Sequence, residues 1–120
     1  MGAFIGDALA LGRPSGSWYG GLEPAWKVSL VCGMPCAIYH QLPASYYLAA
    51  RFRGDFESAV LHAVNGGGQN QARAILNGAL VGAQTGLSGI PERFLDGLKD
   101  QATLGRLAGR LAAQLGGAET

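Results

Sequence analysis

Apolar residues recur along this chain mainly at intervals of three and four positions, which is the spacing of one helix face. No stretch alternates apolar and polar side chains as a half-buried strand does, and alanine and leucine are far more frequent than valine and isoleucine. The pattern predicts an all-α fold, a compact multi-helix bundle. The expected helices lie near residues 2–11, 25–31, 34–42, 44–52, 56–65, 69–85, 91–98 and 101–115.

Prolines, glycines and one aspartate set the expected helix boundaries. Residues 12–24 are rich in glycine and proline and are expected to form a loop. Pro43 lacks a backbone donor and its ring clashes with the preceding turn, so we expect it to divide residues 34–52 into two helices. Asp55 is a favourable N-cap for the next helix. The expected core face of that helix consists of Phe56, Val60, Ala63 and Val64.

Two of the expected helices carry unusual faces. The helix near residues 69–85 places Gly78, Gly82 and Gly86 four positions apart. Because an interior glycine costs a helix about 1 kcal/mol relative to alanine, this row indicates the close approach of another helix. The last helix has a row of leucines that needs a covering surface. The row consists of Leu104, Leu107, Leu111 and Leu115, with Ala108 beside them.

The length and composition of the chain indicate how many domains it forms and how much apolar surface it exposes. A chain of 120 residues is expected to be a single domain. We divide residues 1–120 into an amino-terminal motif helix (1–12), a loop with a short helix (13–31) and a carboxy-terminal helical part (32–120). Hydrophobic residues make up 48% of the chain and charged residues only 14%. Because the charged shell is sparse, we expect a second copy to cover apolar surface, most simply in a homodimer.

The charge distribution and hydropathy predict no nucleic-acid or membrane partner. The net charge is +1, and the basic residues form no stripe of the kind that neutralises phosphates. No apolar run approaches the roughly 18 to 20 residues that cross a bilayer. The first residues also lack the basic start of a secretory signal. We therefore expect a cytoplasmic protein.

The cysteines and histidines are expected to be structural. Cys32 and Cys36 are too few for a zinc site and do not lie at ligand spacing from His40 or His62. Both cysteines are expected to be reduced and buried. Neither histidine lies near a nucleophile motif. The histidines are therefore expected to be packed inside the fold or at the rim of a site.

Two stretches contain residues that packing alone does not explain. Residues 2–12, GAFIGDALALG, place Asp7 in an apolar helix, where a carboxylate is expected to be paired or to lie at the rim of a site. Residues 63–74, AVNGGGQNQARA, join a helix end, a triple-glycine turn and the start of another helix. The free backbone amides at such a helix start favour anions. The alternative is a turn that only joins two helices.

Together these stretches resemble the motifs of the ADP-ribosylglycohydrolase family, also called the dinitrogenase-reductase-activating glycohydrolases. GAFIGDALALG resembles the family's amino-terminal motif GAxxGDALG. Residues 55–98, DFESAVLHAVNGGGQNQARAILNGALVGAQTGLSGIPERFLDGL, resemble its carboxy-terminal signature in order and spacing. The resemblance implies an all-α fold, of which this shortened chain would hold part.

The resemblance also implies a metal site, from which this sequence departs. In active members two magnesium ions lie between the amino-terminal helices and this loop, and the enzyme cleaves ADP-ribose from a modified side chain. Their loop reads GGDxDT, and its aspartates and threonine reach the metals. Here Gly67 and Gly68 remain, whereas Gln69, Gln71 and Ala72 stand at the ligand positions. A glutamine carbonyl cannot neutralise Mg²⁺ as a carboxylate does. The family's second metal motif, Ser or Thr followed by two aspartates, does not occur in these 120 residues.

These departures predict a pseudoenzyme with no catalytic residues, no metal ligands and no cofactor. If activity remains, the resemblance implies a hydrolase of the ADP-ribosylglycohydrolase type. One alternative is a binder of ADP-ribose or another nucleotide, or a weak hydrolase of ADP-ribosylated substrates. Another is a structural role, because some eye-lens crystallins also resemble this family. The residues expected to hold a ligand are Asp7, Asn65, Gly67, Gly68, Gln69, Asn70 and Gln71.

Overall fold

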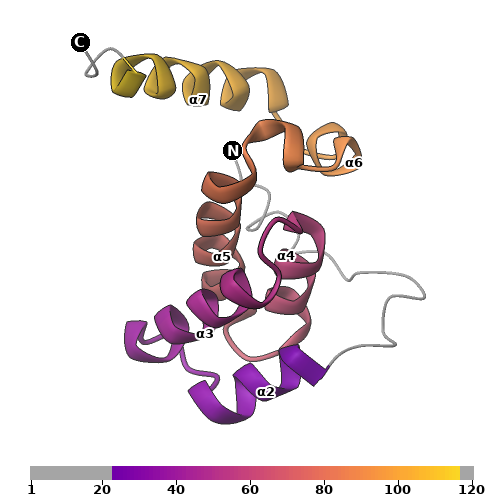
Figure 1. The fold of residues 1–120 in the computed structure, drawn as a ribbon, viewed down its shortest axis with the longest axis vertical. Helices are drawn as coiled ribbons and strands as arrows, with labels where there is room; N and C mark the ends of the chain where they lie inside the picture. Colours follow the sequence, from indigo (N-terminus) through magenta and orange to yellow (C-terminus); the bar gives the residue numbers. More distant parts are fainter. Residues whose placement is uncertain (1–22, 117–120) are drawn as a thin grey trace.

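A computed structural model describes residues 23–116, and this part of the chain is helical and contains no strand (Figure 1). Its helices are α2 (Glu23–Cys32), α3 (Ile38–Arg51), α4 (Phe56–Asn65), α5 (Asn70–Thr85), the 3-10 turn η2 (Leu87–Gly89), α6 (Glu92–Asp96) and α7 (Gln101–Gly116). The all-α prediction is confirmed. The helix expected near residues 2–11 lies outside the described residues.

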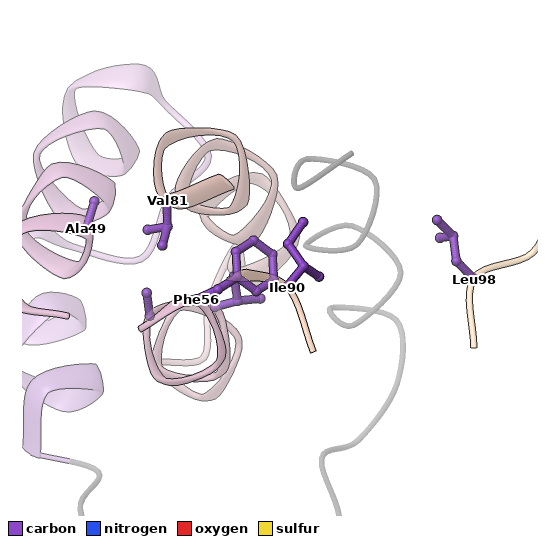
Figure 2. Close-up of a cluster of buried hydrophobic side chains, with 7 residues drawn as sticks. Ala49, Phe56, Val81, Ile90 and Leu98 are labelled. Atoms are coloured by element: carbon purple, nitrogen blue, oxygen red, sulfur yellow. The ribbon is translucent and has the colours of Figure 1, made fainter. Parts of the chain in front are cut away.

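The central helix of the bundle is α5, which packs along both α4 and α3, while α2 contacts α3 and α4 (Figure 1). Two apolar clusters fill the spaces between these helices. The first consists of Ala49, Phe56, Ala59, Val60, Val81, Ile90 and Leu98 (Figure 2). The second lies closer to α2 and consists of Val28, Ala44, Leu48, Ala63, Val64 and Ala74. Because many of these side chains are alanines, the helix backbones approach one another closely.

The start and the buried face of α4 agree with the sequence prediction. Asp55 is the N-cap, and its side chain accepts a hydrogen bond of 3.0 Å from the backbone N–H of Ser58. This bond satisfies one of the donors that a helix start leaves free. The four predicted core residues of α4 are all buried. The helix ends at Asn65, where the chain enters the glycine turn, residues 66–69, that leads to α5.

Pro43 does not divide its helix, so that prediction was wrong. α3 is continuous from Ile38 to Arg51, and Pro43 lies in its second turn. At this position the proline removes one helical donor, and its ring is exposed to solvent. The opposite face of α3 buries Gln41, Ala44, Ser45, Leu48 and Ala49. Burial of that face outweighs the local cost of the proline, which is about 3 kcal/mol in a helix interior.

Other helix ends differ from the prediction by a few residues. α2 begins at Glu23, two residues before the expected start, and thereby includes Pro24. A proline is tolerated there because the first turn of a helix has no internal acceptor for its missing N–H. α6 is shorter than expected and extends only from Glu92 to Asp96, with Pro91 as its N-cap.

The glycine face of α5 and the leucine row of α7 have different surroundings. Gly78 is buried in the bundle, and Gly86 ends α5 with a φ of 69°. The close approach of another helix to this face stays a prediction at Gly78, and at Gly86 a Cβ atom would meet nothing within 4 Å. Leu107, Leu111 and Leu115 are instead 48%, 59% and 68% exposed. Nothing within residues 23–116 covers the outer part of the leucine row.

None of the helices within residues 23–116 combines the length and the apolar character that crossing a bilayer requires. The cytoplasmic location stays a prediction.

The cap of α4 provides a direct test of the fold. Replacing Asp55 by alanine removes the acceptor for the Ser58 N–H, and we expect the free energy of unfolding to fall by about 1 kcal/mol. Urea denaturation followed by circular dichroism measures this loss. Asp55→Asn keeps a capping oxygen and should lose only a few tenths of a kcal/mol. Equal losses in the two variants would contradict the capping role.

Candidate glycine-turn site

The glycine turn has a backbone that only glycine adopts readily. Gly67 and Gly68 have φ values of 71° and 63°, in the left-handed region where a side chain is strained. The backbone N–H of Gln69 donates a hydrogen bond of 3.0 Å to the carbonyl of Met34, and a side chain at position 68 would overlap that of Met34. The turn is therefore held against the segment that joins α2 to α3.

Arg73 supports the turn from inside the bundle. This residue lies in the first turn of α5, and its side chain is 0% exposed. Its Nε donates to the carbonyl of Ala63 at 2.9 Å, and its Nη2 donates to the carbonyl of Gly67 at 2.5 Å. The guanidinium group thus joins the last turn of α4 to the glycine turn. The Ala63 carbonyl, at the end of α4, and the Gly67 carbonyl, in the turn, both receive charge-assisted hydrogen bonds.

A second support comes from α2. The hydroxyl of Ser29 contacts the carbonyls of Gly66 and Ala25, its distance to the Ala25 oxygen being 3.2 Å. A Cβ atom at position 66 would lie 2.7 Å from both the Ser29 Oγ and the Arg73 Nη2. Gly66 has a φ of −67°, which any residue adopts. A glycine is needed there because α2 and Arg73 leave no space for a side chain.

The charge beneath the turn is positive. Burial lowers the pKa of Arg73, because removal from water disfavours the charged guanidinium, and the Coulombic effect of Cys32 acts in the opposite direction. An arginine side chain nevertheless keeps its proton at neutral pH. Within residues 23–116 no carboxylate forms an ion pair with Arg73, and its buried Nη1 has no hydrogen-bond partner. The site therefore contains a buried cation whose charge the described residues do not neutralise.

The predicted ligand-binding residues fall into two groups. Gly67, Gly68, Gln69 and Gln71 are exposed, so the turn presents them together at the surface. The side-chain amides of Asn65 and Asn70 donate instead to the α4 carbonyls of Leu61 and Val64, at 2.8 and 3.1 Å. Asn70 thereby caps the end of α4, whereas Asn65 bonds back to its own helix. Asp7 lies outside the described residues, and the binding role of all seven residues stays a prediction.

The sequence pattern did not reveal the residues that hold the turn. From the sequence alone no role was assigned to Arg73, although it shares a helix face with Asn77, four positions further on, and both residues are buried. If the helical spacing had been applied to the polar residues as well as to the apolar ones, it would have placed Arg73 on that face. Ser29 gave no such signal, because its role depends on how α2 crosses α4.

Both histidines are packed in the fold, as predicted. The Nδ1 of His40 lies 2.5 Å from the carbonyl of Cys32, and that of His62 lies 2.8 Å from the carbonyl of Ser58. The His62 ring also stacks on Phe52 with 4.4 Å between ring centroids. These bonds to main-chain carbonyls fix the rings in place.

The cysteines are free thiols, but the prediction that both are buried was wrong. Cys36 is exposed and Cys32 is partly exposed. Cys36 lies in the bend between α2 and α3, which runs over the surface because Pro35 and the start of α3 at Ile38 leave no helix there. Within residues 23–116 no three histidine, cysteine or acidic side chains are grouped so that they could hold a metal ion.

Comparison with known proteins identifies the family. The sequence model of the ADP-ribosylglycohydrolase family matches residues 5–120, nearly the whole chain, including the glycine turn and the helices on both sides of it. The chain belongs to the ADP-ribosylglycohydrolase family. A protein of Archaeoglobus fulgidus described as uncharacterized is 44% identical over 71 residues, which are 58% of this chain and 22% of the relative. The chain therefore matches less than a quarter of that relative's length. No solved structure matches the chain.

Family membership makes the glycine turn the best candidate site of this ADP-ribosylglycohydrolase relative. The turn, Arg73 and Ser29 all lie inside the matched residues 5–120. The turn combines exposed backbone amides with a buried cation and with neutral side chains at positions 69 and 71. This arrangement suits a negatively charged or neutral polar ligand better than a metal cation.

The close packing at Gly66 can be tested by adding a single methyl group. Gly66→Ala would force Ser29 and Arg73 apart, and we expect a loss of about 2 kcal/mol in the free energy of unfolding, within the usual range for overpacking. Removing the Ser29 hydroxyl should relieve part of this strain. The double variant Gly66→Ala/Ser29→Ala is therefore expected to lose less than the two single losses combined. Strictly additive losses in urea denaturation would contradict the packing at this point.

Proposed function

We propose that this chain is an ADP-ribosylglycohydrolase-like protein without metal-dependent hydrolase activity. The observation that carries the proposal is the guanidinium of Arg73, fully buried beneath the glycine turn and hydrogen-bonded to the Gly67 carbonyl. In active relatives, as the family resemblance implies, two magnesium ions lie at this turn. A fixed positive charge beside the turn repels a divalent cation, and burial strengthens that repulsion because the effective dielectric constant is lower than in water.

The side chains of the turn support the same proposal. Gln69 and Gln71 offer neutral carbonyl oxygens, and Ala72 has no oxygen in its side chain. Magnesium is usually bound through carboxylates, which offset part of the energy of removing its waters. Two neutral amides beside a buried cation carry no negative charge and cannot offset that energy. We therefore propose that the turn needs no metal cofactor.

A second candidate function, the binding of ADP-ribose or a similar nucleotide, is favoured by the same cation. A diphosphate is attracted to the positive charge, and phosphate groups accept hydrogen bonds from the backbone N–H groups of glycine-rich turns. In this turn the N–H groups of Gln69 and Asn70 already donate to the carbonyls of Met34 and Gly68, so the groups offered are those of Gly67 and Gly68. Gly67 leaves that backbone uncovered, since a Cβ atom there would meet nothing within 4 Å, whereas Met34 packs against Gly68. In this proposal Asn65 and Asn70 act indirectly through their hydrogen bonds to the carbonyls of α4. Gly67, Gly68, Gln69 and Gln71 contact the ligand.

The proposed loss of metal chemistry is tested by calorimetry with Mg²⁺. We expect no binding tighter than about 1 mM, the weak end of oxygen-ligated sites, and no release of ADP-ribose from an ADP-ribosylated protein when Mg²⁺ is added. A micromolar Mg²⁺ complex, or Mg²⁺-dependent release, would contradict the proposal. The matched variant Gln69→Asp/Gln71→Asp restores two carboxylates. The affinity of this variant for Mg²⁺ should exceed that of the wild type by less than about tenfold, because the Arg73 charge still opposes the metal.

Nucleotide binding is tested by NMR titration with ADP-ribose. We expect the largest amide shifts at Gly67, Gly68 and Gln69, and an affinity that falls as NaCl is raised, because added salt screens the attraction between the diphosphate and Arg73. Adenosine, which lacks phosphates, is the control and should leave these amides unchanged. Equal shifts with adenosine, or shifts confined to other parts of the chain, would rule out binding at the turn.

A further inference from the structure

The sequence contains two asparagines that are each followed by glycine, in the pairs Asn65–Gly66 and Asn77–Gly78. In such a pair the backbone nitrogen of the glycine can attack the side-chain carbonyl carbon of the asparagine, because glycine has no side chain that hinders the approach. The new carbon–nitrogen bond closes a succinimide ring, and ammonia leaves. Water then opens the ring and yields aspartate or isoaspartate. The two pairs have the same chemistry, so their surroundings decide which of them reacts.

Asn77 is held by the bundle. It lies in the middle of α5, and its side chain is 0% exposed. Its Nδ2 donates a hydrogen bond of 3.1 Å to the carbonyl of Ser45 on α3, and Gly78 beside it is buried. Ring closure requires the side chain to turn onto the next backbone nitrogen, which a helical backbone prevents. Asn77 therefore reacts only after α5 separates from α3, an opening that costs much of the free energy of unfolding.

Asn65 lies instead at a helix end. It is the last residue of α4, is partly exposed, and directly precedes the glycine turn. Its Nδ2 donates a hydrogen bond of 2.8 Å to the carbonyl of Leu61 in the same helix. Ser29 contacts Gly66 through the carbonyl oxygen, so this contact does not engage the attacking nitrogen. Opening of a terminal helical turn costs far less free energy than opening of the bundle.

The packing of the turn keeps this reactive pair in place. A Cβ atom at position 66 would lie 2.7 Å from the Ser29 Oγ and from the Arg73 Nη2. A residue with a larger side chain would slow ring closure at Asn65, but α2 and Arg73 leave no space for one. The glycine that lets the turn pack against its supports therefore also makes Asn65 reactive.

We propose that Asn65 is a modification site, at which spontaneous deamidation changes the glycine turn as the protein ages. Aspartate at this position adds one negative charge, which lowers the formal net charge of the chain from +1 to zero. The carboxylate lies at the C-terminus of α4, where the helix dipole disfavours a negative charge. Isoaspartate also lengthens the main chain by one carbon where α4 joins the turn. Both products disturb the segment that Arg73 and Ser29 hold.

Deamidation also changes the attraction of the turn for ligands. Position 65 is two residues before Gly67, and this separation is shorter than the Debye length of about 10 Å in ordinary buffers. A carboxylate there weakens the attraction for a diphosphate. This consequence rests on the nucleotide binding proposed above, whereas the deamidation itself depends on no ligand.

The test is peptide mapping of the full chain after incubation at mildly alkaline pH and physiological temperature. Trypsin cleaves after Arg53, Arg73 and Arg93, so the two Asn–Gly pairs fall in separate peptides, 54–73 and 74–93. Mass spectrometry detects the exchange of the amide NH₂ for OH, and fragmentation locates it at residue 65. In the folded protein Asn65 is expected to deamidate roughly 100-fold or more faster than Asn77, because only Asn77 needs the bundle to open.

Two controls keep this result open to contradiction. In urea, where both pairs are exposed, the two rates should become similar, which shows that the difference arises from the fold. Asn65→Gln replaces the reacting side chain by one that would have to close a larger ring, and this variant should remain unmodified over the same time. Equal rates at Asn65 and Asn77 in the folded protein overturn the proposal. A modification at position 65 of the Asn65→Gln variant also overturns it, because the reaction would then be a different one.

The effect on the turn is measured separately by NMR. The deamidated protein is separated from the unmodified protein by ion exchange, and the amide signals of Gly67 and Gly68 are compared. These signals are expected to move in the isoaspartate form, because the main chain is longer there. Asn65→Asp carries the added charge without the extra carbon and is the matched control, so it should move them less. Unchanged Gly67 and Gly68 signals in the isoaspartate form would contradict a change of the turn.

Discussion

The buried guanidinium of Arg73 is the interaction on which the arrangement of the glycine turn depends. It joins the end of α4, at Ala63, to the turn, at Gly67, from the first turn of α5. The carbonyl of Arg73 itself accepts a bond of 3.3 Å from the Ser45 hydroxyl on α3, so the same residue links the three helices that form the bundle. A buried charge is costly unless its donors are satisfied. Two of its three nitrogens have partners, and Nη1 does not.

This arrangement explains how the turn keeps its shape. A side-chain cation lies on the side of the turn that faces the bundle, and it satisfies the carbonyl of Gly67 directly. The left-handed glycines and the support from Ser29 also hold the backbone. The shape of the turn is therefore fixed by contacts within the protein, and its chemistry depends on which side chains stand at positions 69, 71 and 72.

Local signals in the sequence predicted the parts of the fold that local interactions determine. Asp55 and the helix after it agree with the structure because a cap and its acceptor lie three residues apart. Pro43 was misread because its effect is decided by burial of the opposite face of α3, which depends on α5. The leucine row of α7 was rightly identified as apolar, but its exposure follows from where α6 directs the chain. The role of Arg73 was missed because it also depends on contacts between different elements. Its partners are the carbonyls of Ala63 in α4 and of Gly67 in the turn.

Hydrogen exchange of the arginine side chains tests the central role of Arg73 most directly. Its Nε–H is buried and bonded to Ala63 at 2.9 Å, whereas Arg106 and Arg110 are exposed and serve as internal references. In D₂O the NMR signal of the Arg73 Nε–H should decay roughly 100-fold or more slowly than theirs, because exchange then requires opening of the bundle. Exchange of Arg73 at the rate of Arg106 would show that the guanidinium is accessible to water and does not hold the turn.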